Sequence, residues 1–462
     1  MSNLVRRFTS NAGANIIGGI GTAIYNLILP SIVVHKLSPE DFSVWSLGIQ
    51  VIIYIQVLGF GVQTAIARFV SADNEIDNKV GIFSTVMAGR KILRILMFLG
   101  VIISVLLMII YPLFFNGLNH DGVTVLRYCI LAFGVSSSLQ LLSLLPIGFF
   151  TGLHKNYIHV LAQLFGRIIS IIIIYLLVKA EASITVLSVG LSVGLVIPCG
   201  LLVYIMNKSQ LFTTEIIMET QIYDRGKELI SYCKVLAVWV FCMLFVNGIQ
   251  PTIAGFFDIK HVGHYSLAMT LVMVMVGLQQ AIMSPIVTVG ATLHASQKNR
   301  ELFRMLKLST VTCFLVLFFS VIFFVICGRY IVKVWLGNDY VMYVYPILIA
   351  LVTTNAIRNI LSPYSLLLIA TGAHKNAHVP AMIEAVCAVL FMSISGWLYG
   401  ALGVAQGSIL ASIAGVCANL LVTLKQVGFI NKSERSIVLL IMFVALILIV
   451  SCYAVFLSVI NR

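Results

Sequence analysis

The sequence predicts an all-α polytopic membrane protein built from two six-helix lobes that are parallel internal repeats. Hydrophobic residues make up 60% of the chain, charged residues make up 10%, and the mean hydropathy is +1.06. Soluble domains carry about 25% charged residues. The apolar runs are long and continuous, as membrane-spanning helices of about 20 residues require, whereas the strands of a membrane barrel alternate in polarity.

A repeated motif indicates the two lobes. Residues 151–156 (TGLHKN) recur with one change as residues 371–376 (TGAHKN), an offset of 220 positions. Further pairs at this offset, or at one position more, are 45–47 (WSL) with 265–267 (YSL), Phe83 with Phe303, and Asn26 and Pro30 with Asn247 and Pro251. The pairs keep the same order along the chain. The period is far longer than that of a solenoid repeat, so it predicts a duplication of a whole lobe.

Twelve apolar runs are the expected spans. They lie at about 11–34, 42–67, 83–111, 123–149, 157–178 and 183–206, and then at about 230–256, 263–290, 305–327, 340–369, 378–398 and 402–424. The predicted domains are an N-terminal lobe over 1–206, a cytoplasmic connector over 207–229, a C-terminal lobe over 230–426, and a tail over 427–462. The run at 437–459 in that tail predicts a thirteenth helix.

Basic residues give the expected orientation. If the N-terminus is cytoplasmic, the outer side holds only six of the 29 lysines and arginines: Lys36, Lys179, Lys260, Arg329, Lys333 and Arg462. Excess lysine and arginine marks the cytoplasmic side, so a cytoplasmic N-terminus is expected. The first run is long and lacks an A-x-A cleavage site, which indicates an uncleaved span. The nine cysteines form no CxxC pair, so neither a disulfide framework nor a metal site is expected.

An even number of spans per lobe is typical of transporters in which two parallel repeats rock around a central cleft. The predicted span at 340–369 carries the most unusual polar stripe in the sequence. Asn355, Arg358 and Asn359 share one helical face with Ser362. A guanidinium at this depth needs a partner or a wet cavity. Its fork suits phosphate oxygens, so Arg358 is either an anion site or part of a structural pair. Glu384 is then either a coupling site for a proton or cation, or a partner of Arg358 or of a loop lysine.

Two proline motifs predict bends in the first and seventh spans. Pro30 and Pro251 each lie four positions after an asparagine, Asn26 and Asn247. Proline removes one helix hydrogen bond and clashes with the carbonyl four residues earlier. Each pair therefore indicates a gating hinge, part of a polar lumen, or a static kink.

Other polar residues complete the expected cleft between the lobes. The candidates for lining this hydrophilic, net cationic cleft are Gln56, Gln63, Gln279, Gln280, Arg68, Arg127 and Arg167. Gln56 and Gln63 are expected on one face of the second span. Basic residues at inner helix ends such as Arg68 and Arg167 are also explained by topology alone, or by attraction of anionic lipids.

The repeated motif itself has two interpretations. Gly152 and Gly372 suit helix C-caps, and the His-Lys-Asn that follows each suits a basic cytoplasmic turn. In the other interpretation, His154, Lys155, His374 and Lys375 contact an anionic head group at the cytoplasmic mouth.

The segment 37–47 (LSPEDFSVWSL) resembles the entry to the second span in polysaccharide transporters of the multidrug/oligosaccharidyl-lipid/polysaccharide (MOP) superfamily. The residues 59–61 (GFG) with Arg68-Phe69 look like the second span of that family. The overall pattern, over about residues 8–425, is most similar to the O-antigen flippases. This resemblance implies a location in a bacterial inner membrane and a substrate, an undecaprenyl-diphosphate-linked oligosaccharide that is moved from the cytoplasmic to the periplasmic leaflet. It also implies transport by alternating access, with membrane lipid as a partner. Amide side chains of the cleft would then contact the sugar, and arginines would contact the diphosphate.

Several alternatives stay open. A multidrug or cation antiporter has the same architecture, and Glu384 suits it. A membrane-embedded polymerase or acyltransferase is less favoured, because a polymerase presents a sizeable outer loop and the duplication is typical of a transporter. A structural scaffold does not explain Arg358. No cofactor, no enzymatic activity and no nucleic acid are expected, and coupling to a proton or cation is open. A monomeric transport unit is expected, with polysaccharide polymerase and chain-length proteins as further partners.

Overall fold

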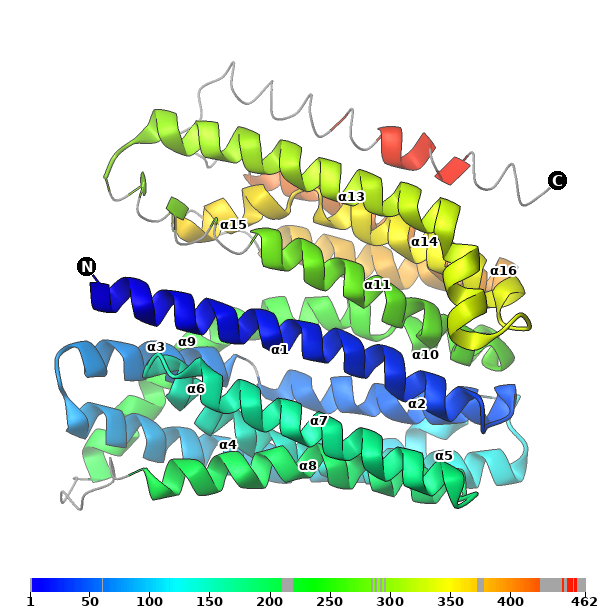
Figure 1. Cartoon of the computed structure of the whole chain (residues 1–462), viewed down its shortest axis with the longest axis horizontal. Coiled ribbons are helices and arrows are strands. Elements are labelled where there is room, and N and C mark those ends of the chain that lie inside the picture. Colours follow the sequence, from blue (N-terminus) through cyan, green and yellow to red (C-terminus); the bar gives the residue numbers. More distant parts are fainter. Residues whose placement is uncertain are drawn as a thin grey trace. The chain divides into compact units, whose positions relative to one another are not determined.

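The computed structural model describes residues 2–59, 61–115, 117–209, 219–283, 296–371 and 378–423, together with residues 286, 289–290, 293–294, 443, 447–451 and 453–454. Every regular element within these residues is a helix (Figure 1). Ten helices in this part of the chain are long and apolar enough to cross a membrane, and a bent pair over Gln221–Lys234 and Leu236–Gly248 gives an eleventh. The prediction of an all-α membrane protein with many spans is confirmed.

The chain forms two compact units, Met1–Leu244 and Phe245–Arg462. The helices of the first unit are α1 (Ser2–Val34), α2 (Pro39–Gln56), η1 (Val57–Gly59), α3 (Val62–Glu75), α4 (Lys79–Ile110), η2 (Tyr111–Phe114), α5 (His120–Gln140), η3 (Leu141–Ser143), α6 (Leu144–Gly152), α7 (Asn156–Lys179), α8 (Ile184–Lys208) and α9 (Glu219–Met243). In this unit α1 packs on α7, α7 on α8, α5 on both α2 and α4, and α3 on α6 (Figure 1).

The predicted second span is not one straight helix. It breaks between α2 and α3, where Gly61 has a left-handed φ of 74° that a side chain would disfavour. Gln56 is the last residue of α2, whereas Gln63 lies in α3. The two glutamines therefore do not share a face of one helix, because the break rotates the second helix relative to the first.

The fourth span breaks in the same way, with the short 3₁₀ helix η3 between α5 and α6. The end of α6 lies close against α3. A side chain on Gly152 would meet the side chain of Val70 at 2.7 Å and the carbonyl of Ala67 at 2.8 Å. The left-handed residue of the following turn is His154, with a φ of 58°. Gly152 is therefore required for close helix packing, and the helix C-cap is Leu153 and not the predicted Gly152.

The second unit has the same kind of broken helices. Its elements are the π-helix η4 (Leu244–Gly248), whose first residue still belongs to the first unit, and then α10 (Gln250–Phe257), η5 (Ile259–His261), α11 (Val262–Met283), α13 (Asn299–Leu336), α14 (Val341–Asn359), α15 (Ser362–Ala370) and α16 (His378–Thr423). Helix α14 ends at Asn359, so Ser362 starts a new helix and leaves the predicted polar stripe. The range of α16 holds two helices that meet at Gly400, which has a left-handed φ of 62°. They pack side by side, since a side chain on Gly407 would meet the backbone of Phe391, and they correspond to the last two predicted spans.

Helix α9 packs with the first unit, although the repeat pattern assigns its C-terminal part to the second lobe. The guanidinium of Arg225 pairs with the buried carboxylate of Asp73 on α3 at 3.1 Å and lies 5.1 Å from the ring centre of Phe69. Arg68 lies 5.0 Å from the ring centre of Tyr232. These contacts hold α9 on α3. The predicted thirteenth helix at 437–459 falls largely outside the described residues.

Candidate functional site

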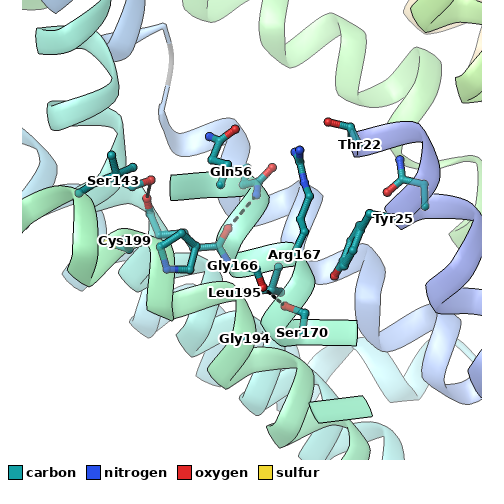
Figure 2. A pocket seen from close by; sticks show the side chains of 15 residues that line it. Thr22, Tyr25, Gln56, Ser143, Gly166, Arg167, Ser170, Gly194, Leu195 and Cys199 are labelled. Carbon is teal, nitrogen blue, oxygen red and sulfur yellow. Dashed lines mark hydrogen bonds between the residues drawn. The ribbon is translucent and has the colours of Figure 1, made fainter. Parts of the chain in front are cut away.

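The first unit contains a polar cavity of about 280 Å³ between α1, α2, α5, η3, α7 and α8. Its lining residues are Thr22, Tyr25, Asn26, Gln56, Gln140, Ser143, Gln163, Gly166, Arg167, Ser170, Gly194, Leu195, Pro198, Cys199 and Leu202. Figure 2 shows Thr22, Tyr25, Gln56 and Arg167 around this space. The fold thus brings three predicted site residues, Asn26, Gln56 and Arg167, to one cavity from three helices.

Sequence reasoning missed other polar residues of this cavity, although their spacing carried a signal. Thr22, Tyr25 and Asn26 form a stripe on α1, and Gln163, Arg167 and Ser170 form another on α7. Residues three or four positions apart share a helical face, so both stripes were visible in the sequence. Each was weaker than the stripe around Arg358 because it includes hydroxyl groups, which are common in membrane helices.

Amide groups surround one side of the cavity. Gln56 donates from Nε2 to Oε1 of Gln140 at 3.4 Å, which joins α2 to the end of α5. The Nε2 atom of Gln140 is buried and has no hydrogen-bond partner among the described residues. A buried donor without a partner is costly, and a ligand oxygen in the cavity would satisfy it. Ser143 and Ser170 use their hydroxyls on backbone carbonyls of Gln140 and Gly166, at 2.7 and 2.8 Å.

Arg167 supplies the only charge in the cavity lining of this unit. It donates from Nη1 to the backbone carbonyl of Gly18 at 3.4 Å. Within the described residues no carboxylate pairs with it. Most of its five donors are therefore available to a ligand.

The buried arginine of the second unit, Arg358, has a carboxylate partner, whereas Arg167 has none among the described residues. Arg358 of α14 donates from Nε to Oε1 of Glu384 at 2.7 Å and from Nη1 to Oδ1 of Asn247. Both charged side chains are nearly buried, at 12% exposed for Arg358 and 11% for Glu384. Its Nη2 atom is buried and has no partner among the described residues. Arg358 and Glu384 thus neutralise each other, as one of the two interpretations from the sequence expected; a role in substrate binding stays a prediction.

Three of the other polar candidates in the second unit form hydrogen bonds within that unit. Asn355 donates to the carbonyl of Leu351 at 3.0 Å, and Asn359 donates to that of Asn355 at 2.9 Å. Gln279 of α11 is buried and donates to Sγ of Cys313 at 3.6 Å, while its Oε1 has no partner among the described residues. Gln280 is exposed, whereas Gln279 beside it is buried.

Three further candidates in the first unit lie outside the cavity lining. Arg127 is exposed on α5, near the helix start at His120. Arg68 is exposed on α3 and stacks on Tyr232. Gln63, on the same helix, is half-buried. The structure therefore gathers Gln56 and Arg167 but not these three.

The two proline motifs have different local structures. Pro30 lies inside the continuous helix α1, whereas Pro251 lies in the first turn of α10. Proline fits a first turn because the N–H that it lacks would have no helical partner there. Asn247 lies in the preceding π-helix, and Gln250 donates to the carbonyl of Val246 at 2.7 Å. The first motif thus has no break in its helix and the second has one, while a hinge role stays a prediction for both.

The first copy of the repeated motif forms a turn between α6 and α7. His154 lies 3.9 Å from the carboxylate of Glu75, and both side chains are exposed. Lys155 precedes α7 and is also exposed. His374 and Lys375 of the second copy lie outside the described residues.

Comparison with solved structures indicates which class of proteins shares this fold. No protein-family model matches the chain, and no curated protein matches it. Among solved structures, it is similar to an inward-facing multidrug resistance MATE family transporter of the MOP superfamily, with a TM-score of 0.71 and 14% identity over 88% of this chain and 95% of that one. It is also similar to the lipid II flippase MurJ in an inward closed conformation, with a TM-score of 0.70 and 16% identity over 98% and 99%.

A third similar structure is a MOP superfamily transporter from Pyrococcus furiosus whose binding pocket has reverse polarity, with a TM-score of 0.65 and 14% identity over 92% of this chain and 96% of that one. The chain therefore has the fold of MOP superfamily transporters, which include both a flippase and multidrug transporters. It is a multi-pass membrane protein. At these identities the likeness establishes the fold and leaves the substrate open.

Proposed function

We propose that this protein is a flippase that moves an undecaprenyl-diphosphate-linked oligosaccharide from the cytoplasmic to the periplasmic leaflet of a bacterial inner membrane by alternating access. In this proposal the N-terminus is cytoplasmic, the transport unit is monomeric, and the polymerase and chain-length proteins act on the product. The sugar and diphosphate cannot cross hydrocarbon unaided, because each polar group without a hydrogen bond costs several kcal/mol there.

The observation that carries the proposal is the composition of the cavity in the first unit. It is lined by four amide side chains, Asn26, Gln56, Gln140 and Gln163, and by a single charge, Arg167. Amides both donate and accept hydrogen bonds, as sugar hydroxyls do. A guanidinium that lacks a carboxylate partner suits a phosphate. A cationic drug would instead favour acidic residues, and the described lining has none.

Arg167→Gln tests this proposal in proteoliposomes loaded with a fluorescent undecaprenyl-diphosphate oligosaccharide. Loss of a charge-assisted phosphate contact of about 1.5–3 kcal/mol should slow translocation at least about tenfold. The control is Arg127→Gln, which removes the same charge from an exposed position outside the cavity and should leave the rate unchanged. Equal rates for the Arg167 variant and the unchanged protein would contradict the proposal.

A second candidate is a multidrug or cation antiporter, and the buried carboxylate of Glu384 favours it. In that reading, protonation of Glu384 would alternate with its pairing to Arg358. Arg358→Gln would then abolish proton-driven efflux of a cationic dye from vesicles. Dye efflux by the unchanged protein, together with no translocation of the lipid-linked oligosaccharide, would select this function over the flippase.

A further inference from the structure

Helix α4 carries a basic cluster, Arg90, Lys91 and Arg94, that neither the cavity nor the pairing in the second unit uses. Arg90 donates from Nη2 to Oδ1 of Asn207 at 3.1 Å, which joins α4 to the last turn of α8. Lys208 follows directly and is exposed, as are Lys91 and Arg94. Among the described residues no carboxylate pairs with any of these four cations.

The cluster lies where the exposed face of α4 changes from basic to apolar. Ile95, Phe98 and Ile102 are 57–63% exposed, and they follow Lys91 at four, seven and eleven positions. This spacing places all four residues on one helical face. Such an apolar face contacts the hydrocarbon of the bilayer, so Lys91 and Arg94 lie at the level of the lipid head groups.

The matching helix of the second unit, α13, shows how far basic residues extend along the helix in the other copy of the repeat. Helix α13 starts at Asn299, which matches the start of α4 at Lys79 with the offset of 220. The last basic residue in the cytoplasmic half of α13 is Lys307, whereas the position that matches Arg94 is Phe314. Seven residues of helix correspond to about 10 Å. The basic residues of α4 therefore extend about 10 Å further along the helix than those in the matching half of α13. Membrane topology alone does not require this extension.

The positive charges of Arg90 and Arg94 repel each other unless an anion lies between them. Arg90 and Arg94 are four positions apart on one helix and close enough for their charges to interact. Like charges at this spacing destabilise a helix, and a phosphate between two guanidinium groups converts that repulsion into charge-assisted hydrogen bonds. The position at head-group depth supplies such phosphates from the lipid itself.

We propose that Arg90, Lys91 and Arg94 of α4, with Asn207 of α8, bind the phosphate head group of an anionic phospholipid in the leaflet at this end of the first unit. Arg90 is oriented by Asn207, and Lys91 and Arg94 present their charges at the membrane surface. The site is separate from the cavity and does not depend on which substrate the protein transports.

The test is native mass spectrometry of the full chain in a mild detergent, titrated with phosphatidylglycerol and, in parallel, with the zwitterionic phosphatidylcholine. The unchanged protein should retain phosphatidylglycerol in preference to phosphatidylcholine. The variant Arg90→Gln/Arg94→Gln should bind phosphatidylglycerol about 30-fold more weakly, the combined effect of two basic residues at an anionic membrane surface. Binding of phosphatidylcholine should not change.

The matched control is Arg300→Gln/Arg304→Gln on α13, which removes two exposed arginines at the same spacing from the twin helix. It should retain normal phosphatidylglycerol binding. A second variant, Lys91→Gln/Arg94→Gln, changes only exposed side chains, so its folding should be normal and its binding should still weaken. Undiminished binding in both α4 variants, or an equal loss in the α13 control, would overturn the proposal.

Discussion

Arg167 in the first unit and Arg358 in the second are both arginines within membrane-spanning helices, yet the two units satisfy them in opposite ways. Arg358 is held by Glu384 and Asn247 and is nearly buried. Arg167 lines a cavity, donates to one backbone carbonyl and, within the described residues, has no acidic partner. A paired arginine is neutral as a unit, whereas an arginine in a polar cavity keeps its charge for a ligand. The contrast supports the proposal that Arg167 contacts the substrate, while a substrate role of Arg358 stays a prediction.

The largest expected effect comes from breaking the pair in the second unit. Glu384→Leu leaves Arg358 buried without its carboxylate, and removing one partner of a buried pair costs about 3–5 kcal/mol. The free energy of unfolding in detergent should fall by this amount. The double variant Arg358→Met/Glu384→Leu removes both charges and should recover most of it. A loss below about 1 kcal/mol in the single variant would show that Arg358 does not depend on Glu384.

A third arginine separates the effect of pairing from that of depth. Arg225 pairs with Asp73 at 3.1 Å, but its side chain is 19% exposed against 12% for Arg358, and it also pairs with Glu228 at 3.0 Å. Arg225→Gln should lower the free energy of unfolding by about 2 kcal/mol, less than the loss for Glu384. A double-mutant cycle with Asp73→Asn measures the coupling between the two side chains. Additive effects of the two substitutions would show that this ion pair does not hold α9 on α3.

The cavity arginine should behave in the opposite way to Arg358. Arg167→Gln removes one hydrogen bond to Gly18 and leaves no carboxylate unpaired, so the free energy of unfolding should change by less than about 1 kcal/mol. The measurement is the same unfolding curve as for the Glu384 variants. A loss as large as that of Glu384→Leu would mean that Arg167 has a structural role, and it would end the contrast between the two units.

The smallest effect is expected at the surface. Lys36 and Glu181 lie 3.9 Å apart, and the glutamate is 84% exposed. Exposed pairs contribute about 0–1 kcal/mol and are weakened by salt. Glu181→Gln should therefore leave the unfolding curve almost unchanged. A measurable loss that persists in high salt would indicate that charge pairing stabilises this chain regardless of burial.

Composition and the repeat predicted the fold class well, because few structures satisfy all backbone hydrogen bonds inside a bilayer. Long apolar runs must form helices, and a duplicated run must form a duplicated helix. The break at Gly61 was not predicted, since it depends on tertiary packing. The sequence singled out Arg358 because it lies in an apolar run and named Glu384 as one partner for it, but it did not decide between that pair and an anion site.

The site residues were predicted less completely. Gln56, Asn26 and Arg167 were named, and the fold places them at one cavity. Gln140 was not, because it follows a run of serines that is also explained by close helix packing. Arg127 and Arg68 were named for their charge, and both are exposed, since long basic side chains extend toward water or stack on aromatic rings.

The π-helix at Leu244–Gly248 distinguishes the two matched asparagines. Asn26 and Asn247 are equivalent positions of the repeat. Asn26 lies in the continuous helix α1 and lines the cavity of the first unit. Asn247 lies in the π-helix and accepts a hydrogen bond from Arg358. A π-turn holds one residue more than an α-turn, so it rotates the residues that follow it around the helix axis. A local change in helix type thus accompanies the change of the same amide from a cavity-lining group to a partner of a buried guanidinium.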